Sequence, residues 1–184
     1  MSWFDQAEVQ VIDGDILSLD VEAVGCGIKT SLEFYGAIGN QLGLRCGETL
    51  KDTIRRALDD RPGRRLQLGE ALTVPVTSLG TIQKVILIAY WADDNEYTAR
   101  LVYKSYVNAL REAFAHNVRA LALPLLGAKP WSKRFGEFGA TLLKVLHDLD
   151  ELPTSDGYPV SRLCFVSNNS VQVAALRQRF DDEL

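Results

Sequence analysis

Two almost wholly apolar runs, at residues 84–90 and 118–126, constrain the fold of this chain more than any other feature. Each run is short, and each precedes a longer segment in which apolar residues recur at helical spacing. Runs of this kind are typical of strands buried on both faces, because helices cover both sides of the sheet that contains them. We therefore expect a sheet with helices on either side.

Strands and helices alternate along the rest of the chain. Further strands are predicted at 9–12, 21–25, 71–76 and 163–166, and helices at 34–42, 47–60, 96–115, 133–149 and 171–180. Pro75 places its strand at an edge or an irregularity, and Asp93, Asp94 and Asn95 are N-cap candidates for the third helix. The pattern predicts one three-layer α/β/α domain over residues 1–184, with a mixed or mostly parallel sheet of about six strands.

Composition argues against several classes of function. The formal net charge of −4 gives no long-range attraction to nucleic acid or to an anionic membrane. Cys26, Cys46 and Cys164 fit no zinc-binding spacing, and together with the two histidines they predict no metal site and a reducing cytoplasm. No apolar run reaches the ~18 residues of a membrane span, and the first residues lack the pattern of a signal peptide.

The turn after the first predicted strand carries Gly14-Asp15-Ile16. Ligands of open α/β sheets bind outside the carboxyl ends of the strands, and this turn lies at such an end. The Asp15 carboxylate is able to accept a hydrogen bond from an exocyclic amine such as that of adenine. It is also able to cap a short helical turn, and the turn by itself favours the cap.

Two further segments are predicted to be loops that end at helix N-termini, where free N–H groups favour phosphate. In segment 25–38, Gly25 and Gly36 let the backbone approach a ligand, while Lys29 is either directed at the ligand or solvated. Cys26 in the same segment is either a reactive thiolate or, as we favour, a small buried residue. In segment 124–134, Trp131 covers a ribose or base, or packs partly buried.

Taken in order along the chain, these segments resemble the macro domain, a module that binds ADP-ribose. Gly14-Asp15-Ile16 resembles the family's Gly-Asp-Ile turn, in which the aspartate holds the adenine amine. Gly36-Ala37-Ile38 resembles the start of the family's first long helix, and Gly69-Glu70-Ala71 resembles its Thr-Gly-Glu-Ala strand entry. Residues 124–127 fall where the family has a Pro-Ala-Ile strand and a glycine-rich diphosphate loop. The similarity covers nearly the whole chain.

The chain departs from the family pattern around the far half of the ligand. Cys26 and Lys29 stand where the family has two asparagines, the first of which orients the distal ribose in many members that hydrolyse ADP-ribosyl bonds. Residues 32–36 replace the family's run of glycines, and residues 127–131 replace its Thr-Gly-Ile-Tyr-Gly sequence. The resemblance therefore supports the adenine end of a site better than the ribose end.

The resemblance implies binding of ADP-ribose or an ADP-ribose-derived nucleotide, including a modified NAD-derived signal of the kind that some bacterial antiviral systems sense. The ligand-binding residues expected on this basis are Asp15, Ile16, Gly25, Lys29, Glu33, Phe34, Tyr35, Gly36, Ala37, Gly127, Ala128, Lys129 and Trp131. Two alternatives stay open. One is an ADP-ribosyl hydrolase with Cys26, Lys29 and Glu33 as candidate catalytic residues, and the other is a protein-interaction module with a degenerate pocket. No cofactor is expected, and a binding module is favoured over an enzyme.

Overall fold

Six strands form one sheet in the computed structural model, which describes residues 7–59, 61–92, 98–126, 135–150 and 159–183. The strands are β1 (Glu8–Asp13), β2 (Ala23–Lys29), β3 (Ala71–Leu79), β4 (Ile82–Trp91), β5 (Ala120–Pro124) and β6 (Arg162–Ser167). Their order across the sheet is β1-β6-β5-β2-β4-β3, and only β3 and β4 pair antiparallel. The predicted mixed sheet is confirmed.

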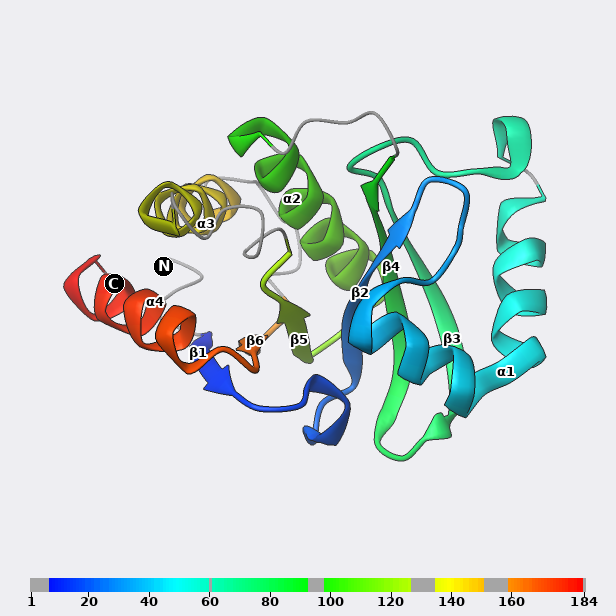
Figure 1. Ribbon diagram of the computed structural model, residues 1–184, viewed down its shortest axis with the longest axis horizontal. Helices are drawn as coiled ribbons and strands as arrows, with labels where there is room; N and C mark the ends of the chain where they lie inside the picture. The colour runs from blue at the N-terminus through cyan, green and yellow to red at the C-terminus, as the bar shows by residue number, and fades with distance from the viewer. Residues whose placement is uncertain (1–6, 60, 93–97, 127–134, 151–158, 184) are drawn as a thin grey trace.

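Helices cover both faces of this sheet (Figure 1). The α-helices of the described residues are α1 (Gly36–Leu58), α2 (Ala99–Ala115), α3 (Phe135–Asp150) and α4 (Ser170–Glu183). On one face, α1 contributes Leu42, Leu50 and Leu58 to a core. On the other face, α2, α3 and α4 share a second core that contains Tyr106 and Phe138. The three-layer α/β/α prediction is confirmed.

Strand β4 shows why the run at 84–90 contains so few polar residues. Ile86 and Ile88 belong to the core under α2, whereas Val85 and Leu87 belong to the core under α1. All four side chains are completely buried. Since successive side chains of a strand point to opposite faces, a strand covered on both sides has no polar face.

Strand β3 lies at the edge of the sheet, as the proline in its sequence predicts. Pro75 pairs with Lys84, and the register of β3 against β4 becomes irregular directly after this pair. Proline has no N–H to donate, so its position on an edge strand leaves no ladder hydrogen bond unmade.

The predicted helices at 34–42 and 47–60 are both present. They follow one another within α1 and meet at Gly47, whose backbone is not helical, with a φ of 54° and a ψ of −143°. One other helix prediction needs correction. Helix α2 begins later than predicted, and its N-cap is Thr98, whose Oγ1 accepts a hydrogen bond from the Leu101 N–H at 3.2 Å. Threonine is a common N-cap, so the prediction that residues 93–95 cap α2 is wrong; those residues lie outside the described ranges.

The cysteines Cys26, Cys46 and Cys164 are all buried and free of disulfides. Among the described residues, no group of three or more potential metal-ligating side chains occurs. None of the helices in the described ranges combines the length and the apolar character that a bilayer span requires.

Candidate functional site

A cavity of about 400 Å³ lies at the carboxyl ends of four neighbouring strands, β1, β6, β5 and β2. It is lined by residues 14–16 after β1, residues 35–38 at the start of α1, residues 124–126 at the end of β5, residues 166–168 at the end of β6, and by Gly27 and Gln41. Ligands of open α/β sheets bind at this edge, and sites for small molecules have volumes of this order. The cavity is therefore our candidate binding site.

Asp15 lines the cavity and also caps a single turn of 3-10 helix, η2 (Ile16–Ser18). Its Oδ1 accepts a hydrogen bond from the Leu17 N–H at 3.0 Å. Ile16 and Leu17 are buried in the core under α1, and this packing holds the turn in place. The capping interpretation is confirmed, and the same residue lies on the cavity wall.

Gly25, Cys26, Gly27 and Lys29 lie inside β2 rather than in a loop, because β2 pairs with β4 as far as Lys29. The prediction that a loop begins at residue 25 is therefore wrong. Strand pairing with β4, in which Gly25 pairs with Ile86 and Gly27 with Ile88, outweighs the low strand propensity of glycine.

The glycines of β2 allow close packing against the end of β5. A Cβ at Gly25 would lie 2.7 Å from Leu123 Cδ2, and a Cβ at Gly27 would lie 2.8 Å from Leu126 Cδ2. Carbon atoms do not approach this closely, so a larger residue at either position would force the leucine side chain to move. Gly25 is buried in the sheet and does not line the cavity, whereas Gly27 does.

Cys26 belongs to the core under α1, and its side chain is completely buried. Burial raises the pKa of the Cys26 thiol to about 12. The neutral thiol is therefore the stable form at neutral pH, and the alternative of a reactive thiolate is wrong. The favoured interpretation, a small buried residue, is confirmed.

We expect Cys26 to resist a disulfide reagent in the native protein at pH 8. Roughly 1 in 10⁴ of the thiols would be ionised at that pH, and the sulfur has no access to solvent. Peptide mapping after short labelling should find Cys46 modified before Cys26, because Cys46 is 9% exposed. Equal labelling of the two thiols would contradict this expectation, and unfolded protein provides the fully reactive control.

Lys29 and Glu33 pair with each other instead of facing the cavity. Lys29 Nζ lies 3.0 Å from Glu33 Oε2, and the Lys29 N–H donates to the Glu33 carbonyl at 3.0 Å. Ile28 and Phe34 form an isolated antiparallel bridge in the same turn. Glu33 and Phe34 line a separate groove along α1. The structure thus does not bring Lys29, Glu33 and Phe34 together with Asp15.

Tyr35, Gly36 and Ala37 line the cavity at the N-terminus of α1. Gly36 has a φ of 70°, which glycine adopts without strain. The N-cap residue Tyr35 makes no side-chain hydrogen bond to the first turn of the helix. The ring of Tyr35 packs at a tilt on Trp91 of β4, with 5.7 Å between the ring centroids. Helix N–H groups favour an anion here, beside an aromatic wall.

One wall of the cavity was not predicted from the sequence: it is formed by the end of β6, where Val166, Ser167 and Asn168 line the cavity. The Ser167 carbonyl accepts a hydrogen bond from the Gly14 N–H at 3.0 Å, which ties this wall to the turn that carries Asp15. The signal was a polar run, residues 167–170, directly after a predicted strand. Gly127, Ala128, Lys129 and Trp131, which were predicted to bind the ligand, lie outside the described residues.

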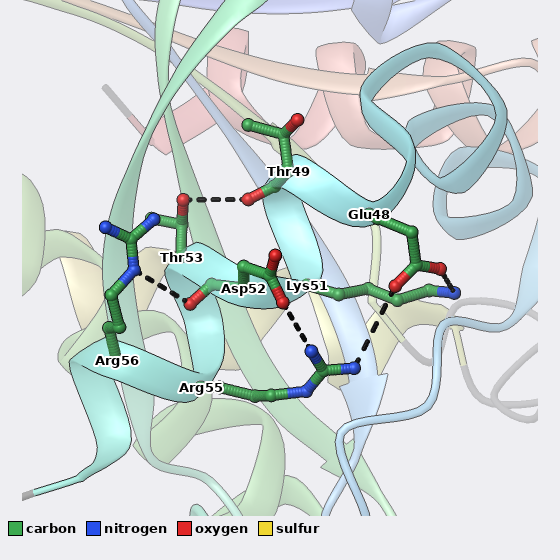
Figure 2. A network of polar contacts seen from close by, with 7 residues as sticks. All are labelled: Glu48, Thr49, Lys51, Asp52, Thr53, Arg55 and Arg56. Atoms are coloured by element: carbon green, nitrogen blue, oxygen red, sulfur yellow. Dashed lines mark hydrogen bonds and ion pairs between the residues drawn. The ribbon is translucent and has the colours of Figure 1, made fainter.

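Charged side chains on the second half of α1 pair with one another (Figure 2). Lys51 Nζ lies 2.6 Å from Glu48 Oε1, and the Arg55 guanidinium contacts the carboxylates of both Glu48 and Asp52. The network belongs to the exposed surface of the helix and not to the cavity. Lys51 and Arg55 are paired with carboxylates, whereas Arg56 donates from Nε to the backbone carbonyl of Asp52 at 3.3 Å.

The family model described as Macro domain matches residues 26–130 of the chain. The chain belongs to the macro domain family. An uncharacterized protein of Thermoplasma volcanium is 25% identical over 153 residues, which are 82% of this chain and 80% of that protein. O-acetyl-ADP-ribose deacetylases of Salmonella typhimurium and Salmonella typhi are 26% identical over 121 residues, which are 65% of this chain and 66% of each relative.

Solved macrodomains have the same fold as this macro domain. A mutant macrodomain of Oceanobacillus iheyensis with ADPR superposes with a TM-score of 0.78 at 16% identity, covering 97% of this chain and 94% of that chain. The Trypanosoma brucei macrodomain in complex with ADP gives a TM-score of 0.74 at 12% identity, covering 94% of this chain and 69% of that chain. The fold that the resemblance implied is confirmed.

Proposed function

We propose that this macro domain binds ADP-ribose, or a small molecule derived from it, in the cavity at the carboxyl edge of the sheet. The observation that carries the proposal is the meeting of Asp15 and the N-terminus of α1 on one cavity of about 400 Å³. Asp15 offers a carboxylate acceptor for an exocyclic amine. The first N–H groups of α1 offer donors for a diphosphate. Solved macrodomains of the same fold hold ADPR or ADP.

Different residues would contact the adenine, the diphosphate and the distal group of the proposed ligand. Asp15 and Ile16 would hold the adenine, with Gly36 and Ala37 donating to the diphosphate from the start of α1. Tyr35, held against Trp91, would pack on the distal group. An aromatic wall suits a modified distal group, so we extend the proposal to NAD-derived signals. The buried free cysteines support a reducing compartment such as the cytoplasm for this function.

Titration calorimetry with ADP-ribose tests the proposal directly. We expect one binding site per chain and a higher melting temperature, because a ligand at a hundredfold excess over its Kd stabilises the folded state by about 2.7 kcal/mol. Adenosine and ADP, measured beside ADP-ribose, divide the affinity between the adenine, diphosphate and distal parts. No heat and no change in melting temperature would contradict the proposal and favour a protein-interaction module.

Hydrolysis of an ADP-ribose derivative is a second candidate, because two relatives are named O-acetyl-ADP-ribose deacetylases. Binding without hydrolysis is favoured because Cys26 is buried as a thiol, and because Lys29 and Glu33 pair away from the cavity. Incubation with O-acetyl-ADP-ribose is expected to leave the ester intact. Release of acetate at a rate proportional to protein concentration would instead establish an enzyme.

A further inference from the structure

We propose that Tyr106 of α2 is a positioning residue for this cavity, and that its hydroxyl holds the turn at the end of β5 in the arrangement that binds the ligand. The inference rests on the proposed function and deepens it. Tyr106 does not line the cavity itself. It acts through residues 124–126, all of which line the cavity.

The Tyr106 hydroxyl makes two hydrogen bonds to this turn. It donates to the Pro124 carbonyl at 2.7 Å and accepts from the Leu126 N–H at 2.8 Å. The Leu126 N–H also approaches the Pro124 carbonyl at 2.9 Å, and the Leu125 N–H donates to the Val166 carbonyl at 3.2 Å. One hydroxyl thus joins both ends of a three-residue turn, while β6 holds its middle.

Packing fixes the Tyr106 ring independently of the hydroxyl. The side chain is completely buried, and its ring makes edge contacts with Phe138 of α3 and Phe165 of β6 at centroid distances of 6.2 and 5.9 Å. Burial also raises the pKa of Tyr106 well above its usual range, so the hydroxyl stays protonated and able to donate. The packed ring thus fixes the position of the Tyr106 hydroxyl, and the hydroxyl holds residues 124–126 through its two hydrogen bonds.

The position of this turn matters to more than one wall of the cavity. Leu126 packs directly over Gly27 of β2, where a Cβ would already be too close to its Cδ2 atom. Val166, which accepts the hydrogen bond from Leu125, lines the cavity from β6. Movement of residues 124–126 would therefore disturb the contacts that this turn makes with β2 and β6. Binding sites lose affinity when the residues that support them are loosened.

The test compares two substitutions on the same helix. Tyr106→Phe keeps the ring and removes the hydroxyl, while the control Tyr103→Phe removes a hydroxyl that donates to Asp148 of α3 at 2.6 Å. We expect the Kd for ADP-ribose to rise roughly tenfold in Tyr106→Phe, because two buried backbone groups lose a partner. Tyr103→Phe should stay within about twofold of the wild type, since its hydrogen bond is partly exposed and does not reach the cavity. The Kd of each variant is measured well below its melting temperature, so that the protein is folded.

Hydrogen exchange of the Leu126 amide in the ligand-free protein provides a second, ligand-independent readout. We expect faster exchange in Tyr106→Phe and an unchanged rate in Tyr103→Phe, since only the former removes one of the two acceptors of the Leu126 N–H and leaves it the Pro124 carbonyl alone. A lower melting temperature with unchanged Kd and unchanged Leu126 exchange would overturn the inference and leave Tyr106 a core residue. If the wild type fails to bind ADP-ribose, the proposed function is overturned, and the exchange rates still decide whether Tyr106 holds the turn.

Discussion

Gly27→Val is expected to weaken ADP-ribose binding by about a hundredfold or more, while the protein still folds. A Cβ at this position would lie 2.8 Å from Leu126 Cδ2 and 3.2 Å from the Tyr35 hydroxyl oxygen. Both side chains line the cavity. Because the closest atoms are the far ends of side chains, they are able to move, and valine would displace them and occupy part of the cavity. The strain should lower the free energy of unfolding by about 1–3 kcal/mol.

Gly43→Val is the matched control for this substitution. Gly43 lies in α1, and a Cβ there would meet nothing within 4 Å. It does not line the cavity, so the control should bind ADP-ribose as the wild type does. Calorimetry gives the affinities, and denaturant unfolding gives the stabilities. An unchanged affinity in Gly27→Val, in a folded protein, would show that the ligand binds elsewhere.

The second large effect is expected at Asp15, where two substitutions separate two roles. Asp15→Ala removes the cap on the Leu17 N–H, which should lower the free energy of unfolding by about 1 kcal/mol. It also removes the acceptor for the adenine amine, which should weaken binding by roughly 1.5–3 kcal/mol, or about tenfold to a hundredfold. Asp15→Asn retains a side-chain oxygen that is able to cap Leu17, so its stability should stay close to that of the wild type.

The affinity of Asp15→Asn decides whether the carboxylate contacts the ligand. The asparagine side chain has one acceptor oxygen and an amide group that donates. With the oxygen used as the cap, the amide faces an adenine amine that also donates, and affinity should fall nearly as far as in Asp15→Ala. Wild-type affinity in Asp15→Asn, together with loss in Asp15→Ala, would assign the effect to the cap alone. Inosine diphosphate ribose lacks the adenine amine. It should therefore bind the wild type weakly, and its affinities for the wild type and for the two Asp15 variants should be similar.

The layered fold was predictable from the sequence, because the signals for it lie within single strands and helices. The run at 84–90 is apolar since both of its faces are covered, and this burial is visible in the composition of the run alone. Pro75 similarly placed β3 at an edge, because a missing N–H is a property of the residue itself. Asp15 beside Gly14 predicted a cap, since the hydrogen bond joins residues only two positions apart.

Which other residues meet Asp15 and the start of α1 at the cavity depends on tertiary packing. Glycines at 25 and 27 suggested a loop, but β2 continues through them because β4 pairs with both glycines and the end of β5 packs closely against them. Lys29 was expected near a ligand, and its ammonium group instead pairs with Glu33 of its own turn. The contact of Tyr106 with Pro124 and Leu126 depends on how α2 packs over β5. Spacing along the chain does not encode such contacts, so the turn at Asp15 and the start of α1 were predictable, while the wall at the end of β6 was not.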